Sequence, residues 1–153
     1  MEAVRLFPAG TIELILIGLM DEEFQSLWNR LRGDAKWLRG LARSDLAHYY
    51  RSADLLVLPS VCDSFGQVAL EAMACGTPVI ITSACGAPVR DGIDGFVVPP
   101  RDTHALRHAI RTALGERDAL AELGQNASQH ACEFTWDRFH HHMVQLFETI
   151  RRQ

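Results

Sequence analysis

Residues 59–80 read PSVCDSFGQVALEAMACGTPVI and predict a loop, a helix and the start of a strand. The apolar run Leu55–Leu58 comes just before them and stops at the proline that opens the stretch, as a buried strand does. Within the stretch we predict a helix over Phe65–Cys75, with Gly76 as the residue that ends it. Pro78–Thr82 (PVIIT) is then the next strand. A strand, a helix and a second strand in this order predict a parallel pair joined by a helical crossover.

The same alternation continues on both sides of this stretch. The expected strands are Glu13–Ile17, Lys36–Leu38 and Phe96–Val98. The expected helices are Asp21–Arg32, a helix capped by Ser44 and running to Ser52, Thr103–Leu114, Asp118–Cys132 and Trp136–Arg151. Residues 83–95 are rich in turn residues. The fold class predicted is α/β, a Rossmann-like parallel sheet flanked by helices, in one domain over residues 1–153.

Composition excludes several classes of protein. Of the 153 residues, 48% are apolar and 22% are charged, and the formal net charge is -4. No Lys/Arg stripe is present, so a nucleic-acid partner is not expected. The longest apolar runs are far shorter than the ~20 residues of a membrane span, and the start of the chain does not resemble a signal peptide, so we expect a cytoplasmic protein.

The metal-ligating residue types show no pattern typical of a metal site. The four cysteines contain no C-x-x-C pair, so we expect reduced thiols, with Cys75 and Cys85 as the two that could lie near each other. The run His140–His142 lies on a predicted helix, where consecutive side chains point in different directions. No metal site and no cofactor are therefore expected.

The loop and helix start within residues 60–71 carry groups that suit an anionic ligand. The N-terminus of the helix offers unpaired N–H groups, and Gly66 has no side chain to keep a phosphate away from the backbone. Glu71, one to two turns into the helix, can accept hydrogen bonds from the two hydroxyls of a ribose. Asp63, in the loop, can accept hydrogen bonds from sugar hydroxyls. Glycine loops and solvated glutamates are common in α/β proteins, however, so these residues alone leave a purely structural role open.

The motif P-S-x-x-[E/D]-x-F-G-x-x-x-x-E-A-M-A-x-G-x-P-V-I resembles the E-x7-E signature of the group 1 family of retaining glycosyltransferases, which have the GT-B architecture. Further blocks match in the same order along the chain. They are Leu14–Gly18 (LILIG), Trp37–Gly40 (WLRG), Tyr50–Ser60 (YRSADLLVLPS), the D-G..D-G-F-V-V-P block over 91–99 and Phe134–Trp136 (FTW). The chain is thus similar to the C-terminal, donor-binding half of such an enzyme.

The resemblance implies a role for each matching residue. Asp63 would contact the transferred sugar as the catalytic carboxylate, although the family usually has the longer glutamate there. The N–H groups of Phe65, Gly66 and Gln67 would bind sugar or diphosphate, and Glu71 would hold the ribose of a nucleotide-sugar donor. The remaining substrate-binding residues implied are Arg39 and Gly40 beside the base, Ser60 in the P-S pair and, less directly, the loop Ala84–Ala87.

The resemblance also implies parts that we do not find in this sequence. Family members carry an N-terminal domain that binds the acceptor (a sugar, a lipid-linked sugar or another hydroxyl), a first strand and a Gly…Arg…Lys block before Glu13. In the strand order 3-2-1-4-5-6 that first strand is central, so we expect Glu13–Ile17 and Leu55–Leu58 to be imperfectly joined. We expect Ala3–Phe7 to be the end of a helix. Membrane association is expected only through the absent part.

The function implied is transfer of a hexose from a nucleotide sugar, with this chain alone inactive. A binding module for nucleotide sugars without transfer activity is the main alternative, and a sugar-nucleotide epimerase of the same architecture fits less well because it lacks the F-G-x-x-x-x-E-A-M-A-x-G sequence. The Trp136–Ile150 segment has apolar residues at helical spacing, which predicts a packing stripe.

Overall fold

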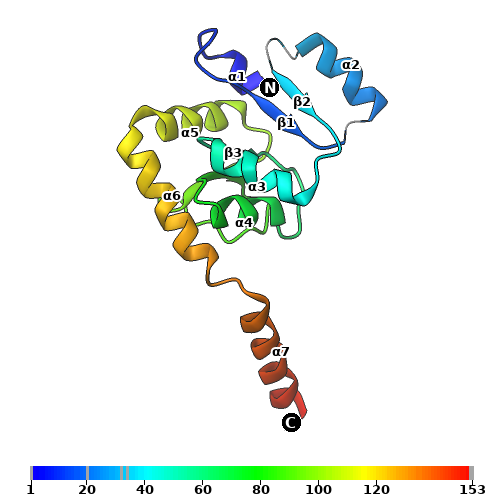
Figure 1. Cartoon of the computed structure of the whole chain (residues 1–153), viewed down its shortest axis with the longest axis vertical. Helices are drawn as coiled ribbons and strands as arrows, with labels where there is room; N and C mark the ends of the chain where they lie inside the picture. Colours follow the sequence, from blue (N-terminus) through cyan, green and yellow to red (C-terminus); the bar gives the residue numbers. More distant parts are fainter. Residues whose placement is uncertain (1, 20, 32, 34, 152–153) are drawn as a thin grey trace.

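A computed structural model describes residues 2–19, 21–31, 33 and 35–151. The chain alternates strands and helices up to β4, and three helices follow the last strand (Figure 1). The strands are β1 (Ile15–Ile17), β2 (Lys36–Leu38), β3 (Leu56–Leu58), β4 (Val79–Thr82) and β5 (Gly95–Val98). The helices are α1 (Glu2–Arg5), α2 (Glu22–Leu31), α3 (Arg43–Ser52), α4 (Gln67–Ala74), α5 (Thr103–Gly115), α6 (Arg117–Ala131) and α7 (Trp136–Arg151).

The strands form two separate parallel sheets. β1 pairs with β2, and β3, β4 and β5 pair in that order. Among the described residues no ladder joins β1 to β3, so each has one edge without a strand partner. This confirms that Glu13–Ile17 and Leu55–Leu58 are imperfectly joined. Of the expected helix end Ala3–Phe7, the part up to Arg5 lies in the short helix α1, and Leu6 and Phe7 form the turn after it. α1 packs on α5, where Arg107 Nη2 donates to the carbonyl oxygen of Leu6 at 3.0 Å.

Most predicted elements lie within one or two residues of their observed bounds, and the differences have local causes. The end of α4 is as predicted, because Gly76 has φ 81° and the N–H of Thr77 donates to the Ala72 carbonyl at 3.0 Å. The predicted cap at Ser44 is wrong. The N-cap of α3 is Ala42, whose carbonyl already accepts from the N–H groups of Asp45 and Leu46.

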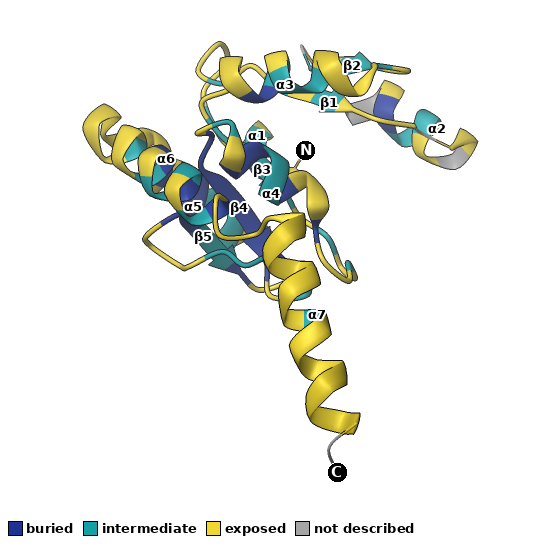
Figure 2. Cartoon of the chain, turned by 60° about the horizontal axis from the view of Figure 1, so that its bottom comes forward, coloured by how far each residue is buried: buried dark blue, intermediate teal, exposed yellow. Residues whose placement is uncertain are grey.

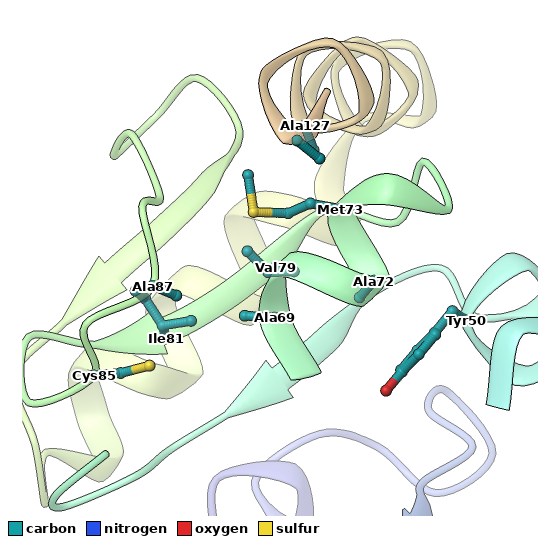
Figure 3. Close-up of a cluster of buried hydrophobic side chains, with 10 residues drawn as sticks. Tyr50, Ala69, Ala72, Met73, Val79, Ile81, Cys85, Ala87 and Ala127 are labelled. Carbon is teal, nitrogen blue, oxygen red and sulfur yellow. The ribbon is translucent and has the colours of Figure 1, made fainter. Parts of the chain in front are cut away.

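One hydrophobic cluster lies between β4 and the helices α4 and α6, and a second lies on the opposite face of β4, against α1 and α5. All four residues of β4 are buried, and Figure 2 shows this strand in the middle of the folded part. Figure 3 shows Met73 projecting from α4 toward Ala127 of α6, with Ala69 and Val79 beneath it. Ala69, Ala72 and Met73 have no exposed surface, so one face of α4 is fixed on the sheet and its other face is left for α3.

The last helix, α7, extends away from the rest of the protein (Figure 1). None of its residues is buried, and Trp136 is 74% exposed. The predicted apolar stripe is present, but the described part of the chain does not cover it. Its exposed members are Trp136, Phe139, Val144, Leu146, Phe147 and Ile150. None of the described helices is both long and apolar enough to cross a membrane.

Candidate functional site

The loop between β3 and α4 is fastened to the end of the neighbouring strand. The hydroxyl of Thr82, the last residue of β4, donates to the carbonyl oxygen of Ser60. The Asp63 N–H donates to the Ala84 carbonyl at 3.1 Å, and the Gly86 N–H donates to the Asp63 carbonyl at the same distance. Loops 59–66 and 83–87 therefore lie side by side at the carboxyl ends of the strands, where open α/β sheets bind ligands. This supports the expected proximity of Ala84–Ala87 to the candidate residues.

Gly66 makes the turn into α4 possible in two ways. Its backbone is left-handed (φ 68°, ψ 49°), a conformation that costs other residues roughly 1–2 kcal/mol. A Cβ there would lie 2.3 Å from Cys85 Sγ and 3.1 Å from Ala87 Cβ. The missing side chain thus leaves space for loop 83–87, and the space for a phosphate expected from the sequence stays a prediction.

Asp63 caps the same turn with its side chain. Its Oδ1 accepts from the N–H of Gly66 at 2.7 Å and from the N–H of Phe65 at 3.2 Å. Two of the three N–H groups expected to face a ligand anion are thus bonded to Asp63. The N–H groups of Gln67 and Val68 precede the first hydrogen bonds inside α4, so they remain oriented out of the helix start.

Glu71 lies on the face of α4 that is turned toward α3. It is four residues after the helix start, about 6 Å further along the axis. Two residues of α3 bond its carboxylate, Tyr50 through its hydroxyl to Oε2 at 3.2 Å and Arg43 through Nη2 to Oε1 at 2.9 Å. The Glu71 side chain is 30% exposed and that of Arg43 is 76% exposed. A carboxylate has about four lone-pair positions, so this one can still accept the two hydroxyls of a diol.

The protonation of Tyr50 is fixed by its surroundings. Its ring is 7% exposed, and this burial, together with the charge of Glu71 and the hydrogen bond to it, raises the pKa of Tyr50 to about 12. The hydroxyl therefore stays protonated at neutral pH and acts as a hydrogen-bond donor to Glu71.

Arg39 and Gly40 follow β2 and come just before α3, the helix that carries Arg43 and Tyr50. The Arg39 guanidinium lies over the Trp37 ring, 3.9 Å from its centroid, and Trp37 Nε1 donates to the Gly18 carbonyl at 3.0 Å. Gly40 is three residues before Arg43, which places their Cα atoms within about 11 Å of each other. The predicted segment therefore leads directly into the helix whose residues bond Glu71, and its place beside a base stays a prediction.

The described surface includes two hollows. One of about 270 Å³ is lined by Leu16, Ile17, Gly18, Leu19, Asp21, Phe24 and Trp37. Another of about 600 Å³ is lined by Glu2, Leu6, Arg101, Asp102, Thr103 and His104. Neither of these two hollows is lined by Asp63 or Glu71.

A buried ionic cluster links residues 90 and 94, which follow loop 83–87, to α6. Asp94 has no exposed surface and accepts from Arg90 Nε at 2.8 Å, Arg90 Nη2 at 2.5 Å and His130 Nδ1 at 2.7 Å. Burial alone raises the pKa of the Asp94 carboxyl, but the hydrogen bonds from Arg90 and His130 outweigh it and hold the pKa below its usual value. The cluster ties loop 83–95 to α6.

The four cysteines are free thiols, as expected. Cys75 precedes β4 and Cys85 follows it, so they lie at opposite ends of that strand and the suggested proximity is wrong. Within the described residues no cluster of three or more His, Cys, Asp or Glu side chains is arranged to hold a metal ion.

The sequence profile described as "Glycosyl transferases group 1" matches residues 1–116. The chain belongs to this glycosyltransferase family. Among curated relatives, the D-inositol 3-phosphate glycosyltransferase of Salinispora arenicola is 44% identical over 96 residues, which are 61% of this chain and 21% of that protein. That of Corynebacterium kroppenstedtii is 35% identical over 135 residues, which are 86% of this chain and 30% of that protein. The chain thus matches between a fifth and a third of the length of these relatives.

Solved structures of glycosyltransferases superpose on nearly the whole chain. Sucrose-phosphate synthase from Thermosynechococcus elongatus has a TM-score of 0.84 and 31% identity, covering 99% of this chain and 41% of that one. Anabaena Alr3699/HepE, solved in complex with UDP, has a TM-score of 0.85 and 25% identity, covering 97% of this chain and 43% of that one. The GT-B, Rossmann-like fold expected from the sequence is confirmed.

Two residues of this glycosyltransferase chain that contact Glu71 were not predicted. Arg43 and Tyr50 lie seven positions apart in α3, a spacing that places them on one face of a helix. That spacing was the available signal. The spacing did not indicate which residue that face of α3 contacts, because the packing of α3 on α4 cannot be read from the sequence.

Proposed function

We propose that this chain binds a nucleotide sugar and forms the donor-binding part of a retaining glycosyltransferase. Glu71 accepts hydrogen bonds from the two ribose hydroxyls. The N–H groups at the start of α4, with Gln67 as the most accessible, face the diphosphate. Arg39 and Gly40 pass beside the base, and Asp63 faces the transferred sugar, with Ser60 in the same loop.

One observation carries this proposal. Tyr50 and Arg43 of α3 hold the Glu71 carboxylate at 3.2 Å and 2.9 Å, and Glu71 lies on α4, the helix that begins at the end of loop 59–66. A fixed diol acceptor one turn from a helix N-terminus fits a ribose followed by phosphates. The UDP bound in Alr3699/HepE, which has the same fold, adds support.

The chemistry of such a transfer needs a stabilised leaving group. In a retaining transfer the acceptor oxygen bonds to the anomeric carbon on the face from which the diphosphate oxygen departs, and the acceptor proton passes to the departing diphosphate. Preorganised N–H donors lower the energy of the negative charge that develops there. The helix start at Gln67 supplies such donors in this chain.

Calorimetry tests the proposal directly. We expect the chain to bind at least one of UDP, GDP or ADP, and Glu71→Ala to weaken that binding at least tenfold, because a hydrogen bond to a charged group is worth ~1.5–3 kcal/mol. Glu122→Ala is the matched control, since Glu122 is an exposed glutamate on α6. Equal affinities of wild type and Glu71→Ala would refute the ribose assignment.

The alternative is a module that binds nucleotide sugars without transferring them. It has the same site, so Glu71→Ala does not separate the two functions. Transfer of a labelled sugar to an acceptor hydroxyl does, because only the transferase forms the new glycosidic bond.

A further inference from the structure

Tyr50 is anchored independently of Glu71. Its side chain belongs to the core cluster with Ala72 and Met73, and its backbone carbonyl accepts from the hydroxyl of Thr77, which is 2% exposed. Figure 3 shows the Tyr50 ring on the α3 side of α4, across the helix from Met73 and Ala127. The position of the Tyr50 hydroxyl is therefore set by the core.

Glu71 has no comparable anchor on its own. Its side chain is partly exposed and has three rotatable bonds, so an unbonded carboxylate there would take several orientations. The two partners of the carboxylate differ in rigidity. Tyr50 at Oε2 is buried, whereas Arg43 at Oε1 is a long, mostly exposed side chain that a ligand can displace.

We propose that Tyr50 is a positioning residue, whose hydroxyl holds the Glu71 carboxylate in the orientation that accepts the two ribose hydroxyls. The inference rests on the function proposed above and adds a residue that acts through Glu71 without touching the nucleotide. Its physical basis is preorganisation, since a carboxylate that is already oriented loses less freedom when a diol binds.

The first experiment tests the Tyr50–Glu71 pair without any ligand. The unfolding equilibrium constant is measured in urea for wild type, Tyr50→Phe, Glu71→Gln and the double variant. We expect Tyr50→Phe to raise this constant about tenfold in the wild type, and less than threefold once Glu71 is already glutamine, because the charged hydrogen bond is then gone. Equal effects in both backgrounds would show that the pair does not form in solution and would overturn the proposal.

The second experiment measures selectivity for ribose. Dissociation constants are determined for UDP, GDP and ADP, each against its 2′-deoxy form. We expect wild type to prefer the ribose form about tenfold, and Tyr50→Phe to reduce this ratio at least threefold. Tyr49→Phe is the matched control and should keep the ratio, since the Tyr49 hydroxyl makes no hydrogen bond within the described residues.

The outcomes separate the two proposals. A ratio kept in Tyr50→Phe but lost in Glu71→Gln would overturn the positioning role and leave the ribose site standing. A wild type that binds none of the nucleotides, or binds ribose and deoxyribose forms equally, would overturn the proposed function and the positioning role with it.

Discussion

Replacing Gly66 with alanine perturbs the turn on which the candidate site is built. The left-handed backbone at this position costs an alanine roughly 1–2 kcal/mol. The new Cβ would lie 2.3 Å from Cys85 Sγ, and overpacking of this kind costs about 1–3 kcal/mol more. We therefore expect Gly66→Ala to lower the free energy of unfolding by about 2–5 kcal/mol.

Thermal and urea unfolding measure this loss. At about 2–4 °C per kcal/mol for a chain of this size, the expected fall in Tm is roughly 4–20 °C. Gly115→Ala is the control, because a Cβ at Gly115 meets nothing within 4 Å and the backbone there is not left-handed. In a Cys85→Ala background the penalty should be smaller, because the 2.3 Å contact with Cys85 Sγ is then gone. A Gly66→Ala protein as stable as the Gly115→Ala protein would refute the reasoning.

Two further predictions concern the charged residues around the site. Arg43→Gln should change the free energy of unfolding by less than about 1 kcal/mol, because the pair is exposed on the arginine side. It should leave nucleotide affinity unchanged or up to about fivefold tighter, because the guanidinium competes for Oε1 of Glu71. A tenfold loss of affinity by calorimetry would mean that Arg43 itself contacts the nucleotide. Asp94→Asn should destabilise the protein by about 3–5 kcal/mol at pH 7, because it leaves Arg90 and His130 without their buried carboxylate. The folded-state pKa of Asp94 is lowered, so its stabilisation is present above the unfolded pKa of about 3.9 and is lost as the pH falls through the folded value. Urea unfolding should therefore show the gap between wild type and Asp94→Asn narrowing below pH 4, and a gap constant from pH 7 to 3 would contradict the account.

The fold was predictable where the pattern is local and regular. The α7 bounds and those of β2 match the prediction, because uninterrupted helical periodicity and a short apolar run between turn residues leave few alternatives. The start of α3 was not predicted. A serine before a helix is a common cap, but the carbonyl of Ala42, two residues earlier, already accepts the first hydrogen bonds of α3.

The positions of the candidate site residues in the fold were predictable, and their contacts were less so. Sequence reasoning identified Asp63, Gly66 and Glu71 and placed them on one loop and helix, which the structure bears out in position. It did not foresee that Asp63 bonds two N–H groups of its own turn, or that Tyr50 and Arg43 bond Glu71. Those contacts depend on how α3 packs on α4 and how loop 83–87 meets loop 59–66, and neither is encoded by spacing along one segment.

The central claim is that Glu71 holds the ribose of a nucleotide-sugar donor. A crystal structure of this chain with the nucleoside diphosphate that it binds most tightly tests that claim most directly. We predict both ribose hydroxyls within hydrogen-bond distance of the Glu71 carboxylate, about 2.5–3.0 Å, with Tyr50 still bonded to Oε2 and Arg43 displaced from Oε1. A nucleotide bound elsewhere, or bound with its ribose hydroxyls facing solvent, would contradict the account.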